Sequence, residues 1–184
     1  MQAAAEAFGA KGYAATSMDD VAAACGITKL IVYRHFDSKE ALYDAVLERV
    51  SERLAEELIE GVRSGRPGVT AARALLVVAR EDPAGFSLLW RHAARELQFS
   101  GHAEEVRKKG VRLADGLLTA MGVSDTTVRR WAAATIVSYL VAAVLHWLEE
   151  GTPERDAEFA EMLSRSLPAL VTAWTEGRDD SRSR

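Results

Sequence analysis

The stretch TSMDDVAAACGITKLIVYRHFDSKEAL, residues 16–42, predicts two short helices joined by a glycine turn and followed at once by a third helix. Ser17 is placed to cap the first helix, and Asp20 three residues later completes a variant of the capping box. Gly26 lies where the backbone must turn sharply, and glycine reaches positive φ without steric cost. This pattern predicts a helix-turn-helix, whose second helix enters the major groove of DNA.

The second helix of this motif has two different faces. Val32 and Phe36 are four residues apart, so we expect both to pack inward, together with Ile27 before the helix. Thr28 is expected to cap this helix. The opposite face carries cationic, apolar and phenolic side chains, namely Lys29, Leu30, Tyr33 and Arg34.

The charge around the motif is positive although the chain as a whole is acidic. The formal net charge is −4, yet Gly26 to Lys39 contains three cations and Asp37 as the only acid. Local charge decides the interaction, because salt screens charges more than about 8–10 Å apart. Ser38 is expected to cap the third helix, and a DNA phosphate would explain Lys39 in its first turn, where the helix dipole disfavours a cation.

A set of residues at fixed spacing covers roughly the first quarter of the chain: Phe8, Gly12-Tyr13, Thr16-Ser17, Gly26-Ile27, Tyr33, His35-Phe36, Lys39 and Leu42. This set resembles the N-terminal domain of the TetR (tetracycline repressor) family of bacterial transcriptional regulators. The resemblance implies that DNA phosphates are held by Ser17, Tyr33, His35 and Lys39, and that base edges are reached by Thr28, Lys29 and Arg34.

Two residues of the recognition helix depart from the family pattern. Leu30 and Ile31 stand where small or hydroxyl residues are commoner in the family. Leu30 is still predicted to contact DNA, since an apolar side chain can touch a thymine methyl.

The rest of the chain predicts helices without strand alternation, so the expected fold class is all-α. We expect a three-helix DNA-binding domain at residues 1–46, a helical regulatory and dimerisation domain at 47–177 and a disordered tail at 178–184. Leucines and valines recur at four-residue steps from Leu42 to Leu58 and predict one long linking helix. The clearest break lies at residues 61–68.

Further helices follow from local signals. Asp82 and Pro83 predict a helix start, and one apolar face is expected from Phe86, Leu89, Trp90, Ala93 and Leu97. Ser124 is expected to begin a helix that ends at about Glu150, and Pro168 is expected to kink or divide the last helix.

Residues 131–148 are apolar enough in length and composition to cross a membrane. The segment also contains several alanines and four polar groups, and no second such segment follows. These features favour instead a helix that lies inside a soluble bundle and is buried on all its sides. Burial on all sides implies a second subunit, and the resemblance implies a four-helix dimer bundle formed by two C-terminal helices from each chain. The expected dimer residues are Leu148, Phe159, Leu163, Leu167, Leu170 and Trp174.

Aromatic and hydrogen-bonding residues on one stripe of this helix suggest a small-molecule cavity, which needs apolar walls and a few polar atoms. The candidate ligand-binding residues are Phe86, Trp90, Met121, Trp131, Thr135, Ser138, Tyr139 and His146. The alternative is that these residues belong to the core or to a subunit interface.

The sequence favours a regulator over an enzyme. His92, Glu96 and His102 have ligand-like spacing, but a solvated surface pair is the preferred interpretation, and no catalytic motif, cofactor or metal site is predicted. One cysteine excludes an intramolecular disulfide, and no signal peptide is visible, so a cytoplasmic location is expected.

The sequence therefore predicts a homodimeric repressor that binds a palindromic DNA operator and is released by a small-molecule effector. The alternatives are a DNA-binding regulator without small-molecule control and a helical scaffold for protein contacts.

Overall fold

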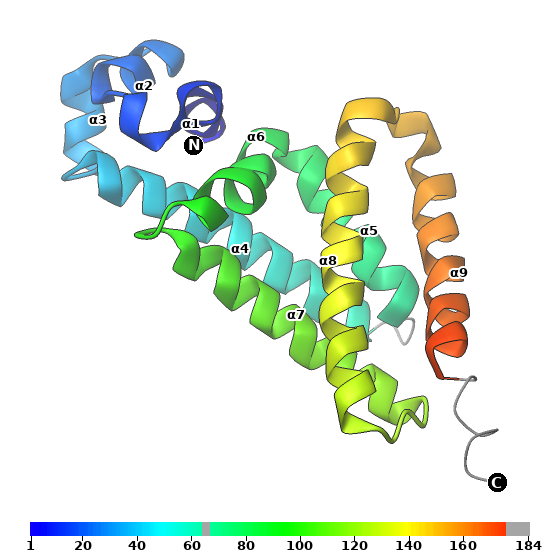
Figure 1. Ribbon diagram of the computed structural model, residues 1–184. Helices are drawn as coiled ribbons and strands as arrows, with labels where there is room; N and C mark the ends of the chain where they lie inside the picture. The colour runs from blue at the N-terminus through cyan, green and yellow to red at the C-terminus, as the bar shows by residue number, and fades with distance from the viewer. Residues whose placement is uncertain (64–66, 176–184) are drawn as a thin grey trace, which may run out of the picture. The chain divides into compact units, whose positions relative to one another are not determined.

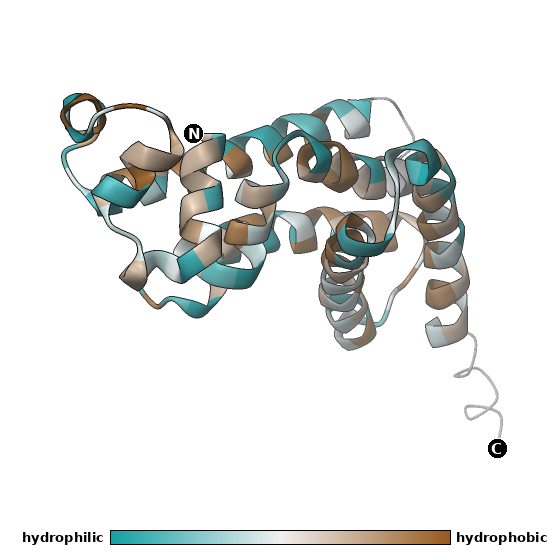
Figure 2. Cartoon of the chain, turned by 90° about the horizontal axis from the view of Figure 1, so that it is seen from above, coloured by the Kyte–Doolittle hydropathy of each residue, from teal (hydrophilic) through white to brown (hydrophobic). Residues whose placement is uncertain are grey.

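The computed structural model describes residues 1–63 and 67–175, and every regular element within these ranges is a helix (Figure 1). This confirms the all-α prediction. The predicted tail at 178–184 and part of the break at 61–68 lie outside the described residues. The chain forms two compact units: unit 1 comprises Met1–Glu56 and Val78–Val106, and unit 2 comprises Glu57–Val77 and Arg107–Arg184. The helices of both units carry hydrophobic and hydrophilic residues side by side (Figure 2).

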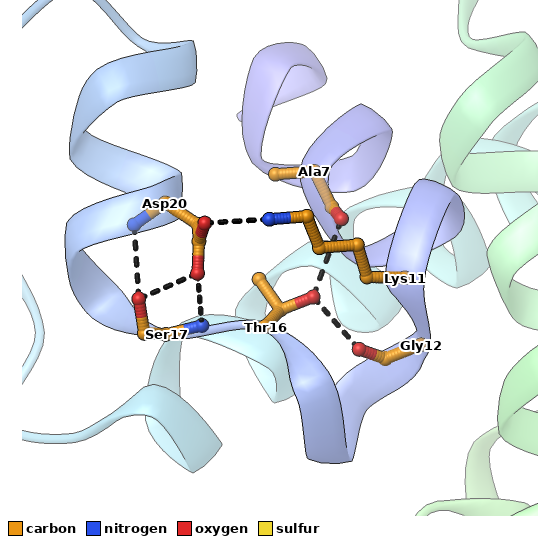
Figure 3. A network of polar contacts seen from close by, with 6 residues as sticks. All are labelled: Ala7, Lys11, Gly12, Thr16, Ser17 and Asp20. Carbon is orange, nitrogen blue, oxygen red and sulfur yellow. Dashed lines mark hydrogen bonds and ion pairs between the residues drawn. The ribbon is translucent and has the colours of Figure 1, made fainter.

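The helix-turn-helix lies in unit 1. It consists of α1 (Gln2–Ala15), α2 (Met18–Ala24) and α3 (Lys29–His35), followed by the long α4 (Lys39–Arg63). The predicted capping box is present at the start of α2 (Figure 3), where the Asp20 backbone N–H donates to Ser17 Oγ at 3.1 Å and the Ser17 N–H donates to Asp20 Oδ2 at 2.8 Å. Gly26 has φ 67°, so the turn uses the left-handed conformation that glycine permits.

An aromatic cluster fixes the start of α4 within unit 1. The Tyr43 ring is fully buried and lies 4.9 Å from Phe8 and 4.3 Å from Phe99, measured between ring centroids. Tyr13 contacts both Tyr43 and Phe99, with its ring centroid 5.0 Å from that of Tyr43 and 4.7 Å from that of Phe99. Because these residues come from α1, α4 and the segment before α7, the cluster ties the helix-turn-helix to the rest of unit 1.

The region after Asp82 is less regular than the sequence predicts. Asp82 caps α6 (Pro83–Ser87) as expected, and its carboxylate accepts from the Gly85 N–H at 3.0 Å. The helix then changes to a π-helical segment η1 (Leu88–His92) and a 3₁₀ turn η2 (Ala93–Arg95). Leu97 is 97% exposed, so its predicted place on a continuous apolar face is wrong, because the helix ends before it. Both α6 and η1 pack against α1.

Unit 2 is built around α8 (Thr126–Glu150), which packs against α9 (Asp156–Thr175) after the short η3 (Pro153–Arg155). The helices α4, α5 (Pro67–Glu81) and α7 (Ser100–Ala120) each contribute residues to both units. The cap of α8 is Asp125 rather than Ser124, since the Asp125 carboxylate accepts from the N–H groups of Thr127 and Val128. Pro168 lies inside α9 without dividing it.

The helix α8 is only partly covered by its own chain. This helix is long and apolar enough to span a membrane by length and composition, yet only 28% of its most apolar window is buried. Trp131 is 52% exposed and Tyr139 37% exposed. One stripe of α8 is therefore an exposed surface of the single chain.

Candidate nucleic-acid interface

The α3 helix presents nearly its whole surface outward. Val32 is 4% exposed and is the buried anchor of the helix, and Phe36 just after it is half-buried. The remaining residues from Thr28 to His35 are exposed, and they include all predicted base-reading positions. A helix held by one apolar side and open on the other matches the docking of a recognition helix in a major groove.

Two local expectations for this region need correction. Ile27 is 40% exposed and does not pack inward, because the turn at Gly26 leaves it on the outer side of the motif. Thr28 occupies the N-cap position of α3 with extended backbone, but its side chain makes no capping hydrogen bond. Its hydroxyl is exposed and free of any capping role.

The cations of α3 differ in their present partners. Lys29 Nζ lies 2.6 Å from Asp19 Oδ2 on α2, and the carboxylate raises the pKa of this lysine. Arg34 and His35 have no ion-pair partner among the described residues. Lys29 must leave Asp19 before it can reach a base, whereas Arg34 is available at once. The partnership of Lys29 with Asp19 was not predicted, since the spacing of ten residues across a turn carries no periodic signal.

Lys39 has a structural role that the sequence did not indicate. Its ammonium group donates to the backbone carbonyl of Tyr13 at 2.8 Å and lies 4.3 Å from the centre of the Tyr13 ring. The cation therefore binds the backbone at the C-terminal end of α1, just after the kink at Gly12, where φ is 78°. A DNA phosphate is not needed to explain its position in the first turn of α4.

The other predicted phosphate contacts are placed at or near the surface. Tyr33 is 45% exposed and His35 is exposed. Ser17 Oγ is engaged in the capping box and donates to Asp20 Oδ2 at 2.6 Å, and Lys11 Nζ pairs with the other carboxylate oxygen at 2.7 Å (Figure 3). The Lys11 and Ser17 contacts hold the pKa of Asp20 well below its usual range. This network keeps α2 attached to α1 beside the recognition helix.

The predicted ligand-binding residues fall into two groups. Phe86 is fully buried in unit 1, and its ring lies 6.4 Å from that of Trp90, whose buried indole N–H has no hydrogen-bond acceptor among the described residues. The remaining candidates belong to unit 2. Met121 is 58% exposed beyond the end of α7, so it does not close an interior cavity within the chain.

The α8 candidates lie along the outer stripe of that helix. Exposed positions are Trp131, Ser138, Tyr139 and His146, and Thr135 is half-buried. Trp131 contacts Trp174 of α9 at 4.8 Å between ring centroids, and Tyr139 Oη lies 3.3 Å from Ser166 Oγ. These contacts join α8 to α9 at the surface of unit 2.

The predicted dimer residues are mostly interior. Phe159, Leu163 and Leu167 are between 3% and 9% exposed, and Phe159 stacks on Trp147 at 4.4 Å between ring centroids. They are core contacts of unit 2, which corrects their assignment to a surface facing a second subunit. Leu148, Leu170 and Trp174 are half-buried and retain exposed area.

The residues considered for a metal site are not gathered into one. Among the described residues no group of three or more histidine, cysteine or acidic side chains is placed to hold a metal ion. His102 Nε2 instead lies 3.0 Å from Asp44 Oδ1.

The fold and the exposed α3 surface define a helix-turn-helix DNA-binding protein. Residues 1–46 match the family model described as bacterial regulatory proteins, tetR family. The N-terminal 46 residues are therefore the DNA-binding domain of this family, which confirms the resemblance found in the sequence, and the chain is a DNA-binding transcriptional regulator.

Several relatives extend the similarity beyond the DNA-binding domain. The transcriptional activator FasR of Mycolicibacterium smegmatis is 28% identical over 160 residues, which cover 82% of this chain and 71% of FasR. A TetR-like regulator from Rhodococcus sp. RHA1 has a TM-score of 0.76 at 23% identity, covering 96% of this chain and 93% of that one. The regulator FadR of Bacillus subtilis, solved in complex with stearoyl-CoA, has a TM-score of 0.66 at 17% identity, and the match covers 90% of this chain and 94% of the FadR chain.

Proposed function

We propose that this protein is a cytoplasmic homodimeric repressor that binds a palindromic operator through α3 of each subunit and leaves it when a small apolar or amphipathic effector binds. The exposed face of α3, open from Thr28 to His35 except at Val32, is the observation that carries the proposal. Two such helices related by a dyad suit the two half-sites of a palindrome.

The surface of α8 and α9 supports the homodimer. Trp131 and Tyr139 are exposed on α8, and Met162 is 51% exposed on α9. Ala142 lies on the same α8 stripe and is also exposed, so two such surfaces can approach closely. Large exposed apolar groups on a soluble regulator mark a protein contact. The expected four-helix bundle would cover them.

The same surface argues for a protein partner rather than a lipid bilayer. The exposed stripe includes Ser138 and His146, and His146 lies 3.9 Å from Glu149. Charged and hydrogen-bonding groups of this kind are costly within hydrocarbon, whereas a subunit interface accommodates them.

The effector proposal rests on Trp90 and Phe86. A buried indole N–H without an acceptor is unusual in a native protein. A ligand carbonyl beside Trp90 would accept a hydrogen bond from this N–H group, and Phe86 offers apolar contact.

Because FadR of Bacillus subtilis was solved with stearoyl-CoA, acyl-CoA thioesters are the first class of ligand to screen by thermal shift. Trp90→Phe is expected to weaken effector binding and leave operator affinity unchanged. If no small molecule changes DNA affinity, the effector proposal fails, and the alternative of a regulator without small-molecule control takes its place.

The DNA-binding proposal is tested with Arg34→Ala. Binding sites are first selected from random duplex DNA with the unaltered protein, and affinities are measured by fluorescence anisotropy. Loss of one base contact is expected to cost roughly 1–3 kcal/mol, confined to one base position in each half-site. Arg112→Ala, which removes an exposed arginine of α7 in unit 2, is the matched control and should bind as the unaltered protein does. Equal weakening on every sequence would show that Arg34 does not read a base.

A further inference from the structure

The recognition helix exposes a leucine where a DNA reader normally carries a polar side chain. Leu30 is 72% exposed, the largest exposure among the large apolar residues of unit 1 apart from Leu97. Burial of a leucine side chain is favourable by about 1.5–3 kcal/mol, so this exposure has no stabilising role in the single chain. An external contact that removed Leu30 from water would therefore be favourable.

The position of Leu30 on α3 points toward the groove. Val32 is the buried residue of this helix, and Leu30 precedes it by two residues, or about 200° around the helix axis. Leu30 therefore lies almost opposite the buried anchor. It also belongs to the first turn of α3, and the N-terminal residues of a recognition helix are those that contact base edges.

The neighbouring cation is directed elsewhere. Lys29 Nζ is held by Asp19 at 2.6 Å and lies 6.0 Å from the centre of the Tyr33 ring. Its charged end is thus turned toward α2, which leaves the first turn of α3 with Leu30 as its most exposed apolar group. Ile31 beside it is 38% exposed and extends the apolar surface.

The chemistry of the major groove selects one complement for such a side chain. Leucine neither donates nor accepts a hydrogen bond, so it cannot distinguish bases by their polar edges. Thymine alone among the four bases presents a methyl group, at C5, in the major groove. Contact between the two apolar groups removes both from water.

We propose that Leu30 recognises the C5-methyl group of a thymine in each operator half-site. The inference rests on the proposed entry of α3 into the major groove, and it assigns one base of the operator by its methyl group instead of its hydrogen bonds. Arg34 keeps its predicted role at a polar base edge, and Lys29 keeps its own once it leaves Asp19.

The test replaces each thymine of the selected binding site, one at a time, by deoxyuridine. This change removes the methyl group and preserves every hydrogen-bonding group. When the contacted thymine of one half-site is replaced, the affinity of the unaltered protein should fall about fourfold, because burial of one methylene-sized group is favourable by about 0.8 kcal/mol. When the equivalent thymines of both half-sites are replaced, the affinity should fall about fifteenfold.

The variant Leu30→Ala should bind thymine and deoxyuridine sites equally well. Leu97→Ala is the matched control, because Leu97 is 97% exposed in unit 1 but lies outside the helix-turn-helix, and it should keep the full sensitivity. The inference is overturned if no thymine shows the effect, or if Leu30→Ala retains it. A pool in which no sequence is enriched contradicts the proposed function itself, so the two failures are distinct.

Discussion

At the scale of single residues, Lys39 makes an internal contact in addition to the DNA phosphate contact predicted for it. Its ammonium group donates to the Tyr13 carbonyl and lies against the Tyr13 ring, and the side chain is half-buried. The phosphate contact implied by the family resemblance would affect DNA affinity, whereas the internal contact affects the stability of the fold. Experiments can therefore separate the two.

Lys39→Ala is expected to weaken binding to all DNA sequences alike and to reduce the salt slope by about one unit per half-site. It should also lower the free energy of unfolding by about 1–3 kcal/mol, since a charged hydrogen bond to α1 is lost. Salt titrations of DNA affinity and urea unfolding measure the two effects. Lys109→Ala, an exposed lysine of α7, serves as the control. An unchanged salt slope would leave Lys39 with the structural role alone.

Tyr43 gives a prediction about pH. Burial raises the pKa of its hydroxyl above the ordinary value near 10, and the negative charge of Glu96 raises it further. The folded state therefore resists ionisation that the unfolded state allows. The stability that depends on neutral Tyr43 is fully present below pH 10 and is lost as the pH rises above 10.

Tyr43→Phe removes this ionisation. Relative to the unaltered protein, the variant should gain at most about 1.4 kcal/mol of unfolding free energy for each pH unit above 10. Urea unfolding at pH 8, 10 and 11 measures the difference. Parallel pH profiles for the two proteins would mean that Tyr43 ionises equally easily in the folded and unfolded chains.

Sequence reasoning succeeded where contacts are local. The Ser17 and Asp20 capping box and the inward Val32 follow from spacings of three and four residues. The Lys29 pair with Asp19 and the Lys39 contact with Tyr13 join residues separated by 10 and 26 positions. Such contacts depend on how helices pack, and no periodic pattern records them.

At the scale of elements, the turn between α2 and α3 decides whether the recognition helix is presented correctly. Gly26 has φ 67°, and no atom outside the turn limits the space at its Cα. The obstacle to a side chain there is therefore the backbone conformation alone, which costs roughly 1–2 kcal/mol for other residues.

Gly26→Ala should lower the free energy of unfolding by about that amount and weaken operator binding, because α3 is displaced or strained. Gly9→Ala is the matched comparison: Gly9 is inside α1, has open space at Cα and no positive φ, and should gain about 0.8–1 kcal/mol. Chemical unfolding of both variants gives the comparison. Equal effects of the two substitutions would contradict the role of the Gly26 conformation.

The elements also show where helical spacing misleads. The face predicted from Phe86 to Leu97 assumes 3.6 residues per turn throughout, but Leu88–His92 is π-helical and the helix ends at Arg95. Leu97 comes after that end, in a turn, and its side chain is exposed to solvent. Nothing in the local composition distinguishes a π turn from an α turn.

At the scale of the whole molecule, the apolar α8 helix carries the proposal of a dimer. Its composition predicts an environment shielded from water, whereas a single chain leaves the stripe with Trp131 exposed. Sequence alone does not separate a ligand cavity from a subunit contact, because both need apolar residues with a few polar groups. The structure distinguishes the two kinds of residue by their exposure: Phe159 and Leu163 are buried core residues of the single chain, whereas the stripe with Trp131 is exposed.

Ala142→Glu places a charge on the exposed stripe without disturbing the core of the chain. In a dimer interface an unpaired buried charge costs several kcal/mol, so the variant should be monomeric and its operator affinity should collapse. Ala120→Glu, at an exposed alanine at the end of α7, should remain dimeric. Sedimentation velocity and anisotropy titrations measure both properties. A dimeric Ala142→Glu protein would place the interface on another surface.

Selection of binding sites from random duplex DNA tests the central claim most directly. A dimer that presents two α3 helices should enrich an inverted repeat, with half-site centres about 34–36 Å apart or at a multiple of that spacing. With Arg34→Ala the preference should be relaxed at one base position in each half-site. A pool without enrichment, or an enriched motif without dyad symmetry, would contradict the account.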